Sequence, residues 1–292
     1  MSWFVAALVA AVALSGQGLS FQRLYKLLPI TTYMAYVWLG SAALLAIVFL
    51  RPEHFEVIGQ NWLPLVLAGA SSWIGNYAYN QALKTQNNIG YIEGIITIRT
   101  AITYVFSLVV FGAPFDATKL VGVIVVTIGV LIISESLPFQ SKKKEKSKVD
   151  TASGDRFGWL AWSFLGAAMF TILTIFVRYA TDGGVSGEVA IVIVLVVAGL
   201  MFVGQGVHDG TSLAISRKHV IILLIAIACA TIGNAADFIS YANTPNLAYS
   251  IAISNTRMII LYVLGLLLFS EPFHRLKAFG IALTFVGVIA MG

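Results

Sequence analysis

The chain contains one cysteine and few charged residues. Cys229 has no second cysteine to pair with, which excludes an internal disulfide and a cysteine-based metal site. Asp, Glu, Lys and Arg together make up 11% of the 292 residues, whereas a typical soluble domain carries about 25%. So few charges cannot cover a water-exposed surface in the usual way, and a soluble globular protein is excluded.

Motifs for metal binding, phosphate binding and nucleophilic catalysis are also missing. His54, His208, His219 and His274 fall near the ends of apolar segments, and no spacing of His, Asp and Glu matches a metal site. The sequence shows no glycine-rich phosphate loop and suggests no Ser–His or Cys–His pair. We therefore expect neither an ATPase nor a membrane hydrolase, and we expect no cofactor and no metal.

Most of the chain is apolar. They account for 59% of the chain, and the mean hydropathy is +0.89. A transmembrane helix needs about 20 mostly apolar residues. Such runs predict an all-α integral membrane protein with ten transmembrane helices, near 2–21, 30–50, 62–83, 89–111, 117–137, 157–177, 188–207, 219–240, 246–269 and 274–291. The first run has no basic residue before Arg23, so we expect it to be retained rather than cleaved as a signal peptide.

One pattern of four residues occurs twice. Each residue of the first copy recurs 158 positions later, at a spacing that places all four on one face of a helix. The two copies are Asn88, Tyr91, Ile95 and Arg99, then Asn246, Tyr249, Ile253 and Arg257. Both lie in predicted transmembrane runs, where an arginine is energetically costly. The pattern therefore indicates a duplicated half that keeps its intramembrane arginine.

The duplication extends well beyond this pattern. Positions 74–130 align with 232–288 without a gap and share about a third of their residues. The sequence predicts a first five-helix repeat over 1–137, a polar basic linker over 138–156 and a second five-helix repeat over 157–292. A repeat with an odd number of spans ends on the opposite side of the membrane from its start. The second repeat should therefore be inverted, as in many transporters with a substrate site between repeats.

These features resemble the EamA type of the drug/metabolite transporter superfamily. The resemblance covers ten spans, two repeats and an ending in which Phe269-Ser270-Glu271-Pro272-Phe273 precedes Lys277, Gly280 and the run Val286-Gly287-Val288. It implies a carrier of small metabolites with a central cavity lined by the first, third, fourth, sixth, eighth and ninth spans. The glutamate before the last span is a frequent family feature, matched here by Glu271, while the first repeat has Ala113 at that place.

The two arginines are the main candidates for substrate binding. Arg99 and Arg257 lie about halfway along their predicted helices, roughly 15 Å of helical rise from either end, so each should face the protein interior. One interpretation is a clamp in which two guanidinium groups hold a carboxylate or phosphate. The other is structural, with each arginine paired to a buried acid, either Glu93 or Asp237. Glu93 is poorly placed for Arg99 because six residues separate them on one helix.

Other polar residues in the predicted spans extend the candidate site. Asn76 shares a helix face with Asn80, and Asp237 shares one with Tyr241, although intramembrane amides also join helices. Glu93 and Asp237 are proton-coupling candidates because a desolvated carboxylate can titrate near neutral pH. The predicted substrate-binding residues are Arg99, Arg257, Asn76, Tyr77, Asn80, Asn234, Asp237, Tyr241, Ser254 and Asn255. Glycines at 122, 129, 280 and 287 recur every two turns and predict a close-packed helix pair.

The charge pattern bears on topology and partners. The net charge of +5 comes mainly from loops, above all the lysines of the 138–156 linker, so we expect no nucleic acid partner. With a cytoplasmic N-terminus, only Arg51, Lys119 and Arg178 would lie on the cytoplasmic side and thirteen basic residues on the other. The positive-inside rule thus places both termini outside, whereas the family resemblance implies cytoplasmic termini.

The leading functional hypothesis is a secondary transporter of a small polar metabolite, an amino acid or related organic anion or zwitterion, that works by alternating access. The alternatives are an exporter of drugs or organic cations, and a non-transporting membrane scaffold with structural ion pairs. We expect a multi-pass protein of the plasma (inner) membrane that acts as a monomer or weak dimer. Its partners would be the lipid bilayer and a small-molecule substrate.

Overall fold

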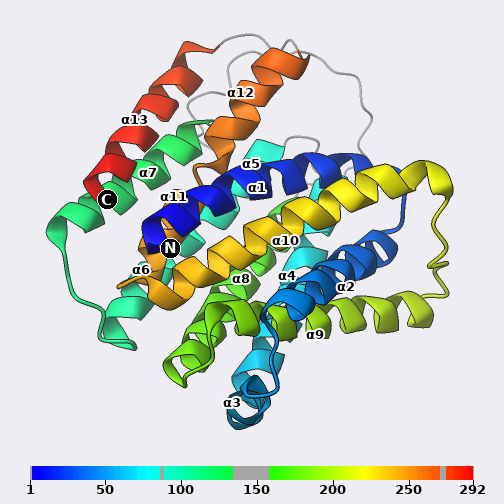
Figure 1. The fold of residues 1–292 in the computed structure, drawn as a ribbon. Coiled ribbons are helices and arrows are strands. Elements are labelled where there is room, and N and C mark those ends of the chain that lie inside the picture. Colours follow the sequence, from blue (N-terminus) through cyan, green and yellow to red (C-terminus); the bar gives the residue numbers. More distant parts are fainter. Residues whose placement is uncertain (1, 86–88, 134–157, 270–273, 292) are drawn as a thin grey trace.

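The described part of the protein is all-helical (Figure 1). The computed structural model describes residues 2–85, 89–133, 158–269 and 274–291, and no strand occurs in these ranges. The helices are α1 (Trp3–Leu24), α2 (Ile30–Phe49), α3 (His54–Gln60), α4 (Trp62–Thr85), α5 (Ile89–Thr97), α6 (Arg99–Val109), α7 (Ala117–Ile133), α8 (Gly158–Asp182), α9 (Gly187–His208), α10 (Val220–Asn243), α11 (Leu247–Ser254), α12 (Arg257–Phe269) and α13 (Arg275–Met291), with a 3₁₀ turn η2 (Arg217–His219). The all-α prediction is confirmed for these residues.

Seven stretches among the described residues are long and apolar enough to cross a membrane. They are Trp3–Leu24, Ile30–Phe49, Ile92–Val109, Gly158–Asp182, Gly187–His208, Arg217–Asn243 and Leu247–Leu264. The protein is therefore a multi-pass integral membrane protein. The other three predicted spans correspond to α4, α7 and α13, which are helical but do not meet these criteria. The helix α7 is apolar but only 17 residues long, and α4 carries a run of hydroxyl and amide side chains in its second half.

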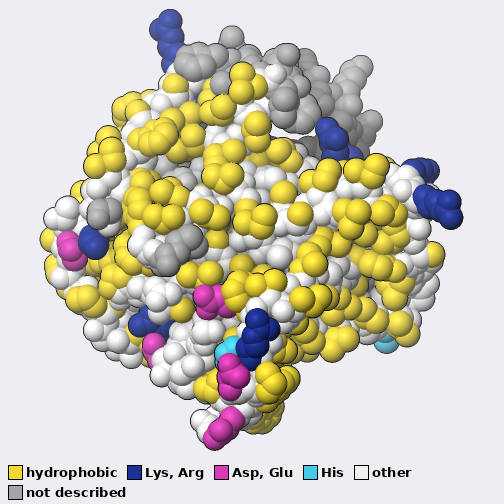
Figure 2. All heavy atoms as spheres, viewed as in Figure 1, with side chains coloured by type: hydrophobic (Ala, Val, Ile, Leu, Met, Phe, Trp, Pro, Cys, Tyr) yellow, Lys and Arg dark blue, Asp and Glu magenta, His cyan; other side chains and the backbone are white. Residues whose placement is uncertain are grey.

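The outer surface supports this assignment. Large apolar side chains are widely exposed on the face shown in Figure 2 and on the surface as a whole. Ile289 is 78% exposed, Val109 77% and Ile47 76%. In water such a surface would be an aggregation liability, but in a bilayer it faces lipid chains of the same polarity.

The long helices pack in antiparallel pairs whose members come from the two halves of the sequence. The closest pairs are α1 with α10, α2 with α9, α4 with α8, and α7 with α13. The pair α1 and α10 runs side by side in Figure 1. The Ser240 hydroxyl of α10 donates to the carbonyl oxygen of Trp3 at 2.8 Å, and Gly233 lies against Leu14. Because the numbering rises on one helix and falls on the other, these two helices are antiparallel.

The pair formed by α7 and α13 crosses at four glycines. A Cβ atom placed on Gly122 would lie 2.9 Å from the carbonyl oxygen of Gly287, and one on Gly129 would lie 2.7 Å from that of Gly280. The reciprocal distances, from Gly287 to Gly122 and from Gly280 to Gly129, are 2.7 and 2.8 Å. The prediction that these glycines form a close-packing face is confirmed, and the two helices are again antiparallel.

Replacing Gly129 by alanine should destabilise the protein by about 1–3 kcal/mol, because the new methyl group would overlap the backbone of α13. The matched control is Gly204→Ala on α9, where an added Cβ meets nothing within 4 Å. The melting temperature of each detergent-solubilised variant, compared with that of the wild type, measures the loss of stability. A Gly129→Ala protein that melts at the same temperature as Gly204→Ala would contradict the close crossing.

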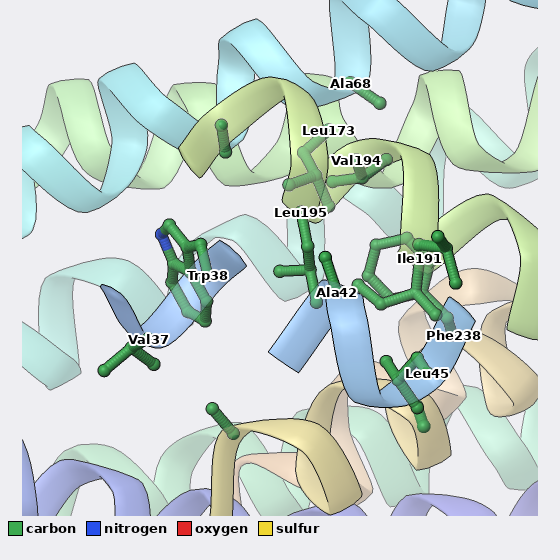
Figure 3. Packing of buried hydrophobic residues seen from close by; sticks show 14 of the residues in the cluster. Val37, Trp38, Ala42, Leu45, Ala68, Leu173, Ile191, Val194, Leu195 and Phe238 are labelled. Atoms are coloured by element: carbon green, nitrogen blue, oxygen red, sulfur yellow. The ribbon is translucent and has the colours of Figure 1, made fainter. Parts of the chain in front are cut away.

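The largest apolar core of the described residues centres on α2, α9 and α10 and also includes residues of α1, α4, α8 and α11. Figure 3 shows part of it, where Trp38 and Ala42 of α2 lie near Leu195 of α9, and Phe238 of α10 lies near Ile191. Trp38, Leu195 and Phe238 also line the internal cavity described below. The core therefore holds one apolar wall of that cavity in a fixed position.

Candidate functional site

An internal cavity of about 120 Å³ lies between the two halves of the chain. Residues from α1, α4, α5, α6, α8, α10, α11 and α12 line it, so each of the six spans that the family resemblance implied contributes. The helices α2 and α9 add Trp38, Ile191, Val194 and Leu195, which that resemblance did not imply. An apolar cavity of about 150 Å³ holds a benzene molecule, so this one can accept a ligand of several non-hydrogen atoms.

Both arginine-bearing spans are interrupted beside the cavity. The helix α5 ends at Thr97 and α6 begins at Arg99, whereas α11 ends at Ser254 and α12 begins at Arg257. Tight turns mark both breaks, with the Ile98 N–H bonded to the Ile95 carbonyl at 3.0 Å and the Thr256 N–H to the Ile253 carbonyl at 2.9 Å. Each arginine thus lies at the first residue of a helical segment that follows a turn. Neither break contains glycine or proline, so no residue pattern marked them in advance.

Arg257 is neutralised by a carboxylate from the other half of the chain. Its Nη2 atom lies 2.7 Å from Oε2 of Glu93 on α5, and the two form an ion pair. The other oxygen of Glu93 accepts a hydrogen bond of 2.8 Å from the Tyr79 hydroxyl on α4. All three residues line the cavity. The structural interpretation of an arginine paired to a buried acid therefore describes Arg257.

Arg99 has no such partner among the described residues. Its side chain is buried, with 8% of the residue exposed, and its guanidinium lies 5.5 Å from the centre of the Phe170 ring on α8. No carboxylate of the described residues lies within ion-pairing distance, and the buried Nε atom has no hydrogen-bond partner. A buried cation without a contacting counter-ion is costly, and Asp237 on the same cavity attracts Arg99 only from beyond ion-pairing distance.

Asp237 on α10 is the second buried acid that lines the cavity, besides Glu93. Its Oδ1 atom accepts a hydrogen bond of 2.6 Å from the Ser254 hydroxyl, and its Oδ2 atom accepts one of 2.5 Å from Tyr241. No Lys, Arg or His of the described residues lies within 4.0 Å of this carboxylate. Asp237, Tyr241 and Ser254 all line the cavity, as the sequence pattern suggested.

Three predicted amide residues line the cavity with their nitrogens already bonded to the protein. Asn76 donates to the Ser72 carbonyl at 2.8 Å, Asn234 donates to the Ala230 carbonyl at 2.8 Å, and Asn255 donates to the Thr100 hydroxyl at 3.2 Å. None of the described hydrogen bonds uses their amide oxygens. These side chains can therefore still accept a hydrogen bond from a ligand.

Tyr77 and Asn80 are not among the cavity-lining residues. Asn80 is buried, accepts a hydrogen bond from the Tyr33 hydroxyl of α2 and donates to the Asn76 carbonyl at 2.8 Å. Tyr77 packs edge-on against Trp162 of α8, with ring centres 6.1 Å apart. The cavity face of α4 carries Tyr79 instead, three residues after Asn76.

Gln17 of α1 is a cavity residue that sequence reasoning missed. It is buried, and its Oε1 atom has no hydrogen-bond partner among the described residues. Its signal was available as a lone amide in an otherwise apolar span. The repeated pattern is only partly described: Asn246 caps α11 by accepting from the Ala248 N–H at 2.9 Å, and Tyr249 and Ile253 are buried. Asn88, the side chain of Tyr91 and Glu271 lie outside the described residues.

The first half of the sequence is similar to a known protein family. A model described as the EamA-like transporter family matches residues 1–135. The first half of the chain belongs to the EamA-like transporter family. None of the curated proteins matches the chain in a sequence comparison.

The fold of this chain is also similar to that of a solved structure described as "Crystal structure of protein". Its TM-score to this chain is 0.75 at 14% sequence identity, and the match covers 99% of this chain and 95% of the solved one. At this identity the likeness concerns the fold alone. It extends over both halves, whereas the family match covers only the first of them.

Proposed function

We propose that the protein is a secondary transporter of small carboxylate-bearing metabolites, either organic anions or zwitterions such as amino acids. The observation that carries the proposal is Arg99, a buried cation that lines an internal cavity and has no counter-ion among the described residues. A substrate carboxylate bound there would supply the missing charge through forked hydrogen bonds. Family membership of the first half supports transport as the activity but does not name the substrate.

A zwitterion would match the cavity because the cavity offers one positive and one negative side chain. Arg99 and Asp237 have opposite charge, lie on the same cavity and are not paired to each other. The carboxylate of an amino acid would bind Arg99, and its ammonium group would bind Asp237 beside Ser254 and Tyr241. The remaining substrate-binding candidates are the amides at Asn76, Asn234 and Asn255. An exporter of organic cations is disfavoured, because a cation in this cavity would leave Arg99 uncompensated.

The proposed architecture is two inverted repeats, residues 1–137 and 157–292, joined by the 138–156 linker outside the described residues. Its ten spans would be the seven apolar stretches together with α4, α7 and α13. The helix pairs support it, because the pair of α1 with α10 corresponds to the pair of α8 with α4 when the halves are exchanged. Under the 158-residue shift the contact of Gly122 with Gly287 becomes that of Gly280 with Gly129, which is present too.

Alternating access requires contacts that can close one end of the cavity at a time. Trp3, Tyr104 and Lys119 of the first half pack around Tyr249 of the second, with ring centres 6.4 and 6.2 Å from Tyr249 and the Lys119 amine 5.7 Å from its ring. These residues lie beyond the cavity, toward the end where α11 begins. Under the 158-residue shift three of the four have identical equivalents, Tyr262, Lys277 and Tyr91, whereas Trp3 corresponds to Ala161. Of these equivalents, the Lys277 amine lies 5.3 Å from the centre of the Tyr262 ring. We assign the four residues to the closed end of the transporter.

Transport by the purified protein tests the proposal. The protein is reconstituted into liposomes and screened with labelled anionic, zwitterionic and cationic metabolites under imposed proton and sodium gradients. We expect uptake of compounds that carry a carboxylate, and no uptake of organic cations. Uptake confined to cations would overturn the proposed substrate class, and a complete absence of transport would favour a scaffold protein. We further propose a plasma (inner) membrane location and a monomer or weak dimer in the lipid bilayer.

A further inference from the structure

The two arginines of the cavity differ because of one residue that the repeats do not share. Glu93 forms the ion pair with Arg257, whereas the repeat equivalent of Glu93 is Ile251, which cannot pair with Arg99. Ile251 is fully buried on α11. The described part of the chain therefore has two symmetry-related cations and an internal counter-ion for only one of them.

Glu93 is held in position as this counter-ion. The residue is 5% exposed, and its two oxygens accept separate hydrogen bonds, 2.7 Å from Arg257 and 2.8 Å from the Tyr79 hydroxyl. Partners on two other helices, α4 and α12, thus fix the carboxylate. It occupies the place at Arg257 that a second carboxylate of a substrate would otherwise take.

From this arrangement we infer that Glu93 restricts the substrate to a single carboxylate. The inference rests on the proposed function. A compound with one carboxylate can satisfy Arg99 and leave the pair of Arg257 and Glu93 intact. A dicarboxylate would bring its second negative charge into a cavity whose remaining ionic groups are a matched pair and the acid Asp237. Like charges in such a low-dielectric site repel strongly, so dicarboxylates are rejected.

The variant Glu93→Gln tests this selectivity with little change of shape. The glutamine amide oxygen can still accept the Tyr79 hydrogen bond, but Arg257 loses its counter-ion. Uptake is compared for two pairs of compounds that differ by one negative charge, asparagine with aspartate and succinamate with succinate. We expect Glu93→Gln to raise the rate for each dicarboxylate relative to its amide by about 10- to 100-fold. The control Glu56→Gln removes the same charge from the exposed helix α3 and should leave the ratio unchanged.

The double variant Glu93→Gln/Arg257→Gln separates charge from structural disturbance. It removes both members of the pair, so the cavity regains its original net charge and the preference for one carboxylate should return. Size-exclusion profiles establish that each variant is folded. The inference would be overturned by a folded Glu93→Gln protein whose ratio of dicarboxylate to amide uptake equals that of the wild type. It would also be overturned if the double variant showed the same raised ratio as Glu93→Gln. If the wild-type protein moves none of the four compounds, the proposed function itself fails.

Discussion

Replacing Arg99 by glutamine should reduce carboxylate uptake by about 100- to 1,000-fold, the loss expected when one partner of a buried charge pair is removed. Arg99 is the only cation lining the cavity that lacks a carboxylate partner among the described residues. Glutamine keeps some hydrogen-bonding capacity but removes the charge that the substrate carboxylate neutralises. Initial rates of labelled substrate uptake into proteoliposomes measure the effect.

Two further variants identify the cause of that loss. Arg99→Lys keeps the charge but not the fork of donors, so it should retain partial activity. Arg51→Gln removes an arginine that is exposed just before α3 and should transport at the wild-type rate. A folded Arg99→Gln protein that takes up carboxylates normally would show that the cavity cation is not the substrate-binding group.

Replacing Asp237 by asparagine should abolish the preference for zwitterions. The new amide oxygen could still accept the Ser254 hydrogen bond, but the side chain would offer no negative charge to an ammonium group. We expect uptake of alanine to fall by about 10- to 100-fold, whereas propionate, which has no ammonium group, should be transported at least as well as before. The ratio of the two initial rates is the measurement, and Asp209→Asn at the end of α9 is the exposed control.

The same variant tests proton coupling. Glu93 has both oxygens engaged by Arg257 and Tyr79, so Asp237 is the better placed of the two proton-coupling candidates. If Asp237 carries the proton, uptake driven by an imposed pH gradient should disappear in Asp237→Asn. An unchanged ratio of alanine to propionate would contradict the ammonium site, and an unchanged pH dependence would contradict the coupling role.

The sequence predicted the helices and pointed to many of the residues that line the cavity, because those features depend on local pattern. Apolar runs mark the membrane helices, and the shift of 158 residues identifies equivalent positions without any knowledge of the fold. Asp237 and Tyr241 meet because they are one helical turn apart. The glycines of α7 and α13 were recognisable for the same reason, since their spacing places each pair on one helix face.

The ion pair of Arg257 with Glu93 was not predictable in this way. The two residues are 164 positions apart, and their contact depends on how the second half packs against the first. Helix geometry showed only that Glu93 suits Arg99 poorly, which agrees with the absence of that pair among the described residues. The difference between the two arginines is therefore a property of the tertiary structure.

Local sequence pattern also did not predict which face of α4 lines the cavity or why this helix can be polar. Asn76 and Asn80 share a helix face, yet Asn76 and Tyr79 line the cavity while Asn80 bonds to Tyr33 of α2. The rotation of α4 is set by its neighbours α8 and α9, against which it packs closely. The same neighbours shield its polar side chains from lipid, so α4 does not need the apolar composition of a lipid-facing span.

A counterflow measurement shows whether the cavity between the two halves carries a carboxylate-bearing molecule across the membrane. Proteoliposomes are loaded with the unlabelled carboxylate that the screen identifies and are diluted into a trace of the same labelled compound. A carrier exchanges the two, so we expect transient accumulation of label above the external concentration, which Arg99→Gln should abolish. Label that only equilibrates would show that the protein is not a carrier of this compound, and label that accumulates equally in Arg99→Gln would show that Arg99 does not bind it.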